Sequence, residues 1–211
     1  MRIDVDPEER REIARRVKAE LRDRMKSVRR ALGPDARAVR SAKIAERVLA
    51  LPAWSRAGTI AVFVPMRTEV DVSLLERAAR EDGKRVAAPR MVPPYDGAPI
   101  NDWSLELRVL EDGVDPIESG HMVREPPATA PRVPFEDVEL ILVPALAFGQ
   151  DGSRLGYGAG HYDGLLPKCT HAARVGVAFD FQLIAEVPEE PRDARVHTIV
   201  TDARVIDVGP P

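Results

Sequence analysis

The chain has 211 residues, enough for one well-buried domain and too few for two comfortable ones. Its net charge of −3 provides no global basic field, so neither a nucleic acid nor a membrane is expected as a partner. A single cysteine, Cys169, excludes an internal disulfide and a zinc site built on several thiolates.

The N-terminal region predicts two helices. From residue 7 to 32, apolar side chains recur every three or four positions until Gly33 and Pro34 stop the run. The recurring residues, expected to form a core-facing seam, are Ile13, Val17, Leu21, Met25, Val28 and Leu32. A second helix is expected over residues 35–49, before Pro52. The N-terminus has no apolar core of a secretory signal, and no apolar run reaches the roughly 18 residues of a membrane span. We therefore expect a cytoplasmic protein.

Strand signals alternate with helix signals in the rest of the chain. Residues 59–65 predict a buried strand, and Ser73 with Glu76 has the spacing of a capping box for the following helix. Further strands are expected at 84–89, 103–109, 138–146, 174–179 and 198–206, with a helix ending near Lys168. This order predicts an α/β fold with a mostly parallel sheet covered by helices on both faces. Ligands of such folds bind beyond the carboxyl ends of the strands, here in the loops after Val64, Pro89 and Pro144.

A glycine-rich stretch lies in the third of these loops. Six of the 14 glycines fall within residues 149–164, in the segment RLGYGAGHYDG and just before it. Its order is neither that of a dinucleotide fingerprint nor that of a Walker A loop, which would need Gly-Lys-Ser/Thr. A different phosphate cradle is the third interpretation, with backbone N–H groups, Arg154 and a helix N-terminus facing the anion and Asp163 holding Mg²⁺. A tight loop whose glycines serve turn geometry alone is the plainer alternative.

The first predicted helix carries a basic stripe. At about 100° per residue, Lys18, Arg22 and Arg29 fall at one edge of the apolar seam, where their stems can lie on the core while the charges face a cleft. The residues alone favour the plainer interpretation, a solvated basic stripe.

Several segments together resemble the 5-formyltetrahydrofolate cyclo-ligase family, also called methenyltetrahydrofolate synthetase. The segment LILVPALAFGQDGSRLGYGAGHYDGLL is similar to the family's signature, and VKAELRDRMKSVRRAL resembles its N-terminal Lys-x-x-x-Arg helix, followed by a serine, here Ser41. TIAVFVPMRTEVD resembles its first strand, and GHMVREP its mid-chain segment with Gly120, Glu125 and Pro126. The resemblance spans about residues 15 to 205.

The resemblance implies a fold and an activity. The fold is a three-layer α/β sandwich, expected here as one domain over 1–211, with a helical arm at about 7–50 and a core at about 58–206. The activity is the ATP- and Mg²⁺-dependent closure of 5-formyltetrahydrofolate, or its polyglutamates, to 5,10-methenyltetrahydrofolate with release of ADP and phosphate. We expect a monomer.

The resemblance also implies roles for particular residues. Lys18, Arg154 and Asp163 match catalytic positions, and Asp163 with Asp193 matches the metal ligands. The positions that match the ATP-binding set are Lys18, Arg22, Arg154, Leu155, Gly156, Gly158, Gly160 and Tyr162. The positions that match the folate-lining set are Val64, Glu69, Tyr157 and His161. His161 stands where many members carry an aromatic residue, Gly164 replaces a frequent Arg, and Arg192 replaces an expected His.

Three functions of other classes remain open at this point. A sugar-phosphate isomerase or acyl-carrier transferase could use the glycine stretch for phosphate without ATP, and would not need Lys18 or Arg22. A non-catalytic nucleotide or folate sensor would have less need of Arg154 and Asp163. An interaction module would use the charged N-terminal helix, with the glycine stretch playing no part.

Overall fold

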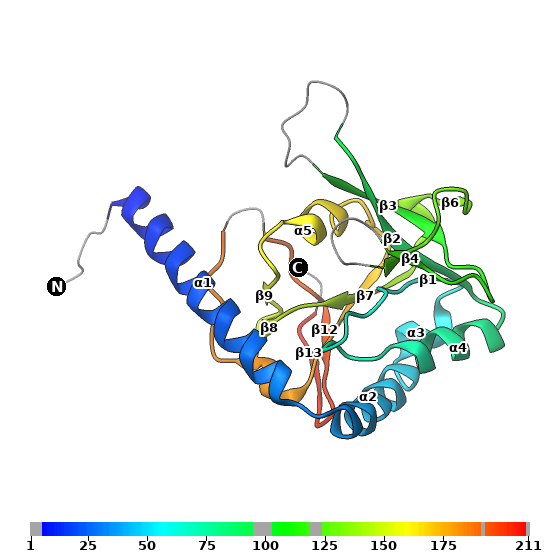
Figure 1. The fold of residues 1–211 in the computed structure, drawn as a ribbon, viewed down its shortest axis with the longest axis horizontal. Helices are drawn as coiled ribbons and strands as arrows, with labels where there is room; N and C mark the ends of the chain where they lie inside the picture. The colour runs from blue at the N-terminus through cyan, green and yellow to red at the C-terminus, as the bar shows by residue number, and fades with distance from the viewer. Residues whose placement is uncertain (1–5, 95–102, 119–123, 191–192, 210–211) are drawn as a thin grey trace.

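A computed structural model describes residues 6–94, 103–118, 124–190 and 193–209 (Figure 1). The helices are α1 (Pro7–Ala31), α2 (Pro34–Leu49), α3 (Pro52–Arg56), α4 (Ser73–Glu81) and α5 (His161–Leu165), with 3-10 turns at Phe135–Asp137 and Asp180–Gln182. Gly120 and Arg192, considered above, lie outside the described residues. No helix in the described part of the chain combines the length and apolar character needed to cross a membrane.

The main sheet has eight strands in the order β13-β12-β10-β7-β1-β2-β3-β6. They are β1 (Thr59–Ala61), β2 (Arg85–Val92), β3 (Ser104–Val109), β6 (Arg132–Val133), β7 (Leu140–Pro144), β10 (Ala173–Val177), β12 (Thr198–Val200) and β13 (Val205–Asp207). The five inner strands, from β12 to β2, are parallel, and the outer strands β13, β3 and β6 pair antiparallel. The predicted mostly parallel sheet is therefore confirmed.

Two smaller sheets accompany the main one. The first has the order β11-β8-β9, from β8 (Ala147–Gly149), β9 (Arg154–Leu155) and β11 (Leu183–Ile184). The second pairs β4 (Ile117–Glu118) with β5 (Arg124–Glu125). Figure 1 shows α1 passing beside β8 and β9, so the longest helix runs along the small sheet rather than over the large one.

Helices cover both faces of the main sheet, as predicted. On one face α2, α3 and α4 bury a core that includes Ile44, Trp54 and Leu75 against β1 and β7. On the other face the short α5 and the turn after it contribute Leu165 and Cys169, which is fully buried. Burial raises the pKa of the Cys169 thiol to about 11, so this side chain is an inert core residue.

Several sequence predictions were wrong in detail. Ser73 is the first helical residue of α4 and makes no capping bond; its amide donates instead to Asp71 Oδ1 (3.0 Å), and Glu76 pairs with Arg80 (2.7 Å). The helix expected to reach Lys168 ends at Leu165, because irregular turns follow it. The strand expected at 59–65 has three residues, and 198–206 forms a hairpin of two strands.

The apolar seam of α1 is only half right. Met25 is buried and Leu21 packs beside it against β9, but Ile13, Val17 and Val28 are exposed. The reason is that α1 turns the face with Lys18 and Arg29 toward the rest of the molecule. The apolar residues of the predicted seam lie partly on the face beside it, which is exposed.

A polar cluster closes the C-terminal hairpin onto the turn after β10. Asp180 accepts hydrogen bonds from Arg204 (2.8 and 2.7 Å) and from the Thr201 hydroxyl (2.9 Å). Burial opposes the ionisation of Asp180, but these hydrogen bonds outweigh it and hold the pKa of this carboxyl below its usual range.

Candidate active site

The glycine stretch begins where the small sheet ends. β8 and β9 form a hairpin after β7, which leaves Arg154 and Leu155 buried and puts residues 157–160 on the surface. Gly158 (φ +108°) and Gly160 (φ +70°) have positive φ values that other residues rarely adopt. Within the described part of the chain, the amides of residues 156–160 donate no hydrogen bond to a protein group. Five N–H groups are thus available to an anionic ligand.

Helix α1 contacts this stretch directly. Arg22 Nε donates to the carbonyl of Gly156 (3.0 Å), and a Cβ added to Gly158 would lie 3.4 Å from Arg22 Cζ. Glycine is therefore favoured at 158 by its backbone angle, whereas the arginine lies at ordinary van der Waals distance from the position of the added Cβ. The contact joins residues 134 positions apart in the chain.

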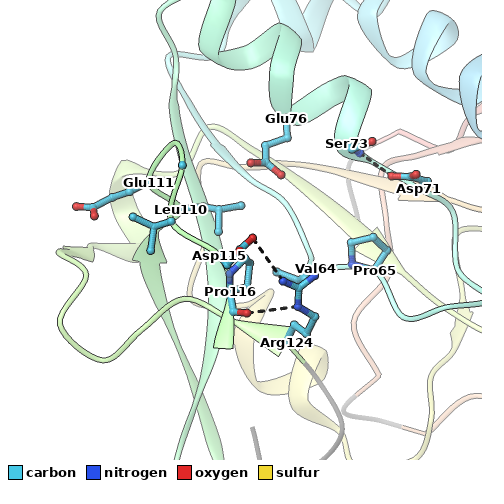
Figure 2. Close-up of a pocket in the computed structure, with 12 residues that line it drawn as sticks. Val64, Pro65, Asp71, Ser73, Glu76, Leu110, Glu111, Asp115, Pro116 and Arg124 are labelled. Carbon is cyan, nitrogen blue, oxygen red and sulfur yellow. Dashed lines mark hydrogen bonds and ion pairs between the residues drawn. The ribbon is translucent and has the colours of Figure 1, made fainter. Parts of the chain in front are cut away.

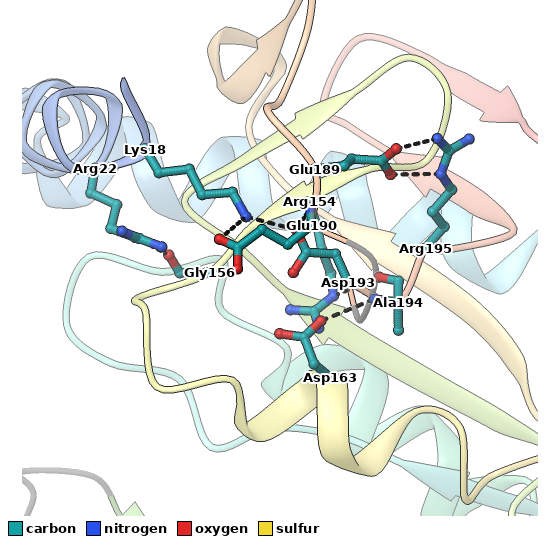
Figure 3. Close-up of polar contacts among 10 residues, drawn as sticks. All are labelled: Lys18, Arg22, Arg154, Gly156, Asp163, Glu189, Glu190, Asp193, Ala194 and Arg195. Atoms are coloured by element: carbon teal, nitrogen blue, oxygen red, sulfur yellow. Dashed lines mark hydrogen bonds and ion pairs between the residues drawn. The ribbon is translucent and has the colours of Figure 1, made fainter. Parts of the chain in front are cut away.

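Lys18, one turn earlier on α1, is 5% exposed. Its ammonium lies 2.7 Å from Asp193 Oδ2 and 3.1 Å from Glu190 Oε1 (Figure 3). A cation buried to this degree needs such partners. With Arg29 also buried, the interpretation of a solvated basic stripe was wrong.

A second ion pair lies beside the first. Arg154 Nη2 donates to Asp163 Oδ1 (2.5 Å), and Arg154 Nε donates to the carbonyl of Ala194 (3.0 Å). The amide of Ala194 donates back to Asp163 Oδ1 (3.0 Å), so Asp163 and Asp193 are linked through a single peptide unit (Figure 3). Burial lowers the pKa of Arg154 and the Asp163 charge opposes that shift.

Tyr162 packs against the Arg154–Asp163 pair. Its ring lies 5.8 Å from the Arg154 guanidinium carbon, an attractive cation–π arrangement. Burial, with a smaller contribution from the Glu69 charge, raises the pKa of the Tyr162 hydroxyl, so this hydroxyl stays neutral.

Glu69 is the centre of a second polar group, in the loop after β1. It is 5% exposed and accepts from the Met66 amide (3.0 Å) and the Tyr157 hydroxyl (3.2 Å). Burial raises the pKa of Glu69, and the Met66 hydrogen bond, the Arg29 charge and the Tyr157 hydrogen bond oppose this. Burial and the Glu69 charge raise the pKa of Tyr157 to about 12. The structure thus brings two of the four predicted folate-lining residues into contact.

The other two predicted folate-lining residues are Val64 and His161. Val64 lines a cavity of about 410 Å³, and none of the other predicted site residues is among the described residues that line it (Figure 2). Of the described residues in the cavity wall, four are carboxylates (Asp71, Glu76, Glu111 and Asp115) and one, Arg124, is a cation, and this balance disfavours an anionic ligand there. His161 is the first residue of α5 and is partly buried.

The residues expected to hold a metal are two carboxylates. No group of three or more His, Cys, Asp or Glu side chains suited to a metal ion occurs among the residues that the structure describes. Asp163 and Asp193 fit Mg²⁺ all the same, because this ion keeps several waters and takes one or two carboxylates together with substrate phosphates.

Sequence reasoning missed three members of the site. Arg29 contacts Glu69 and Tyr157, Glu190 contacts Lys18, and Thr68 accepts hydrogen bonds from Arg29. The sequence places Arg29 in the basic stripe of α1 but assigns it no function. Thr68 and Glu190 carried no signal, since each is one polar residue in a polar loop.

Glu125, part of the resembling mid-chain segment, lies outside this site. It is buried, pairs with Arg90 (2.9 Å) and accepts from the Met91 amide (2.9 Å). These contacts tie β5 to β2.

Comparison with known proteins decides the family. A model described as the 5-formyltetrahydrofolate cyclo-ligase family matches residues 14–202. The chain belongs to this family. The resemblance read from the sequence is confirmed, and the chain is a member of an enzyme family.

Curated relatives and a solved structure agree with this membership. The 5-formyltetrahydrofolate cyclo-ligase of Escherichia coli K12 is 29% identical over 180 residues, which cover 84% of this chain and 96% of the relative. That of Mycolicibacterium smegmatis is 32% identical over 149 residues, covering 70% and 75%. The solution structure of the Aquifex aeolicus 5,10-methenyltetrahydrofolate synthetase superimposes with a TM-score of 0.77 at 28% identity, covering 92% of this chain and 94% of that one.

Proposed function

We propose that this chain catalyses the ATP- and Mg²⁺-dependent cyclisation of 5-formyltetrahydrofolate to 5,10-methenyltetrahydrofolate, with release of ADP and phosphate. Family membership supports the overall reaction. The observation that carries the assignment of sites is the approach of two cations from α1, Arg22 to the glycine stretch and Lys18 to Asp193.

Lys18, Arg22 and Arg154 would hold the ATP phosphates. Two of these cations, Lys18 and Arg154, already pair with carboxylates, so nucleotide binding would exchange a carboxylate partner for a phosphate oxygen. The free amides of residues 156–160 would add neutral donors to the same phosphates. Asp163 and Asp193 would hold Mg²⁺, which supplies charge neutralisation at the γ-phosphate when bound.

The reaction needs an activated formyl oxygen, because an amide-like oxygen is a poor leaving group. The formyl oxygen attacks the γ-phosphorus, ADP departs, and N5 and the formyl carbon become a phosphorylated iminium. N10 then attacks that carbon and loses its proton, and the C–O bond breaks to release phosphate. The groups that serve this sequence position the reactants and neutralise charge, and no nucleophilic side chain is required.

Glu69 would bind the pterin. A buried carboxylate is an acceptor for the paired N–H groups of a pterin's amino edge, and its hydrogen bonds to the Met66 amide and the Tyr157 hydroxyl fix its orientation. Tyr157 and His161 would border the same pocket, and Val64 would approach it from the β1 side.

The test is turnover of purified protein with 5-formyltetrahydrofolate, Mg²⁺ and ATP, followed by the absorbance of the methenyl product. Formation of ADP in equal amount, and transfer of ¹⁸O from a labelled formyl group into phosphate, are the expected results. Product that forms without ATP would contradict the mechanism, and binding of ATP or folate without turnover would favour the sensor.

A further inference from the structure

Arg29 is a buried cation at the junction of three chain segments, and it is 3% exposed. Its Nε and Nη2 donate to the Thr68 hydroxyl (3.2 and 2.9 Å), and Nη2 also donates to the Tyr157 hydroxyl. Its Nη1 lies 3.7 Å from Glu69 Oε1. One guanidinium therefore ties α1 to the loop after β1 and to the glycine stretch.

The contacts use the shape of arginine as well as its charge. All three nitrogens of a rigid planar fork are used: Nε and Nη2 face Thr68, Nη2 also faces Tyr157, and Nη1 faces Glu69. The guanidinium carbon lies 5.5 Å from the Tyr157 ring centroid. A lysine ammonium at the end of a flexible stem would be a single charge and could not hold all three groups in one geometry.

We propose that Arg29 is a positioning residue of the folate site, which fixes the Glu69 carboxylate and the Tyr157 ring in the arrangement that receives the pterin. The inference rests on the proposed function. The same helix carries Lys18 and Arg22 at the glycine stretch, and 11 residues of helix separate Lys18 from Arg29 by about 16 Å. Helix α1 thus spaces the phosphate site from the folate site.

The charge of Arg29 also keeps Glu69 able to accept hydrogen bonds. Burial raises the pKa of Glu69, and Arg29 is the cation that opposes this. Among the described residues, Tyr157 from the glycine stretch and Tyr162 from α5 are also ionisable groups near this pair, and the Glu69 charge contributes to the raised pKa of both hydroxyls. Without Arg29 the carboxyl would hold its proton to higher pH, and a protonated carboxyl is a poorer acceptor for pterin N–H groups.

The experiment compares Arg29→Lys and Arg29→Gln with Arg30→Gln, a control at the next, exposed position of α1. We expect KM for 5-formyltetrahydrofolate to rise about tenfold to a hundredfold in the Arg29 variants, with a smaller change in kcat. In Arg29→Gln the acid limb of the kcat/KM profile should move to higher pH, because Glu69 loses its cation, whereas Arg29→Lys keeps a positive charge there and should move it less. The dissociation constant of ATP should stay within about twofold, and Arg30→Gln should match the wild type.

Thr68→Val provides a variant that leaves the charge of Arg29 in place but removes the acceptor of two of its hydrogen bonds. It should raise KM for the folate a few-fold, and its acid limb should stay where it is in the wild type. This variant decides the question if Arg29→Gln fails to fold.

The proposal is overturned if Arg29→Lys and Thr68→Val bind 5-formyltetrahydrofolate as the wild type does. A folded Arg29→Gln that keeps the wild-type acid limb overturns the effect of the Arg29 charge on Glu69. Direct folate binding without ATP separates this failure from that of the proposed function. A wild type that binds the folate without turning it over contradicts the proposed function alone, and the binding of the variants then still decides the role of Arg29. A wild type that binds no folate overturns both.

Discussion

The Arg154–Asp163 pair makes a prediction about stability that does not depend on any ligand. Arg154 is 4% exposed at its side chain and Asp163 is 26% exposed, with 2.5 Å between the paired atoms. Removing one partner of a buried pair costs about 3–5 kcal/mol, because the other charge is left in a poorly solvated place. Asp163→Asn keeps an oxygen for Arg154 but removes the charge, and a quarter of Asp163 is in contact with solvent. We therefore expect the free energy of unfolding to fall by about 2–3 kcal/mol.

The assay is urea or thermal unfolding in EDTA, without nucleotide or folate. For a chain of this size the expected loss corresponds to a fall in Tm of about 4–12 °C. The matched control is Asp23→Asn, since Asp23 is 84% exposed at its side chain and its Lys26 partner is 3.8 Å away. The control should change the unfolding free energy by less than about 0.5 kcal/mol.

Either of two results would refute the reasoning. In the first, the free energy of unfolding of Asp163→Asn in EDTA lies within about 0.5 kcal/mol of the wild-type value, and the pair then contributes nothing to stability without a ligand. In the second, Asp23→Asn loses as much stability as Asp163→Asn, and the loss then comes from the change in net charge. A loss that appears only when Mg²⁺ is present would give Asp163 a metal-binding role without the structural one.

Three further predictions concern the phosphate side and the C-terminal hairpin. Lys18→Met should raise the dissociation constant of ATP by about tenfold to a hundredfold, because one phosphate donor is lost and two carboxylates lose their cation. The control, Lys26→Met on the same helix, should leave this constant unchanged. Equal dissociation constants for the two variants would contradict the assignment of Lys18 to the ATP phosphates. Gly158→Ala should cost about 1–3 kcal/mol in unfolding free energy and weaken ATP binding, since its φ is +108°, whereas Gly156→Ala should be tolerated because its Cβ would meet the nearest atom at 3.6 Å. Asp180→Asn should be less stable than the wild type at pH 5–7, and the difference should shrink below about pH 4. The pKa of Asp180 is lower in the folded than in the unfolded chain. The ionised carboxylate therefore stabilises the fold at a pH above its pKa in the unfolded chain, and this stabilisation is lost as the pH falls through its pKa in the folded chain. A stability difference between variant and wild type that grows in acid would contradict this reasoning.

Local pattern was sufficient for the class of fold. Helix periodicity and apolar runs located α1, α2 and the inner strands, because each of these segments makes its own hydrogen bonds or buries its own apolar face. The boundaries were less accurate, since the length of a strand depends on where its neighbours pair. The expected strand at 59–65 keeps only three residues for this reason, as β2 and β7 pair with those alone.

The glycine stretch shows the same division within the site. Its composition indicated a phosphate cradle, and the positive φ values of Gly158 and Gly160 agree with the choice of residue. Its partners could not be inferred from composition. Arg22 and Gly156 are 134 positions apart, and Lys18 and Asp193 are 175 apart, so only the packing of α1 against the small sheet brings them together.

The sequence by itself therefore determined the mostly parallel α/β fold, the family and the position of the glycine stretch, because these depend on residue types and short-range spacing. The tertiary structure alone decided the burial of Lys18 and Arg29, which the sequence had favoured as solvated. A basic stripe has the same residue spacing whether it faces solvent or packs against the protein. Whether it is buried depends on the carboxylates that face it. Those carboxylates, Glu69 and Asp193, come from distant loops whose meeting point depends on the fold of the whole chain.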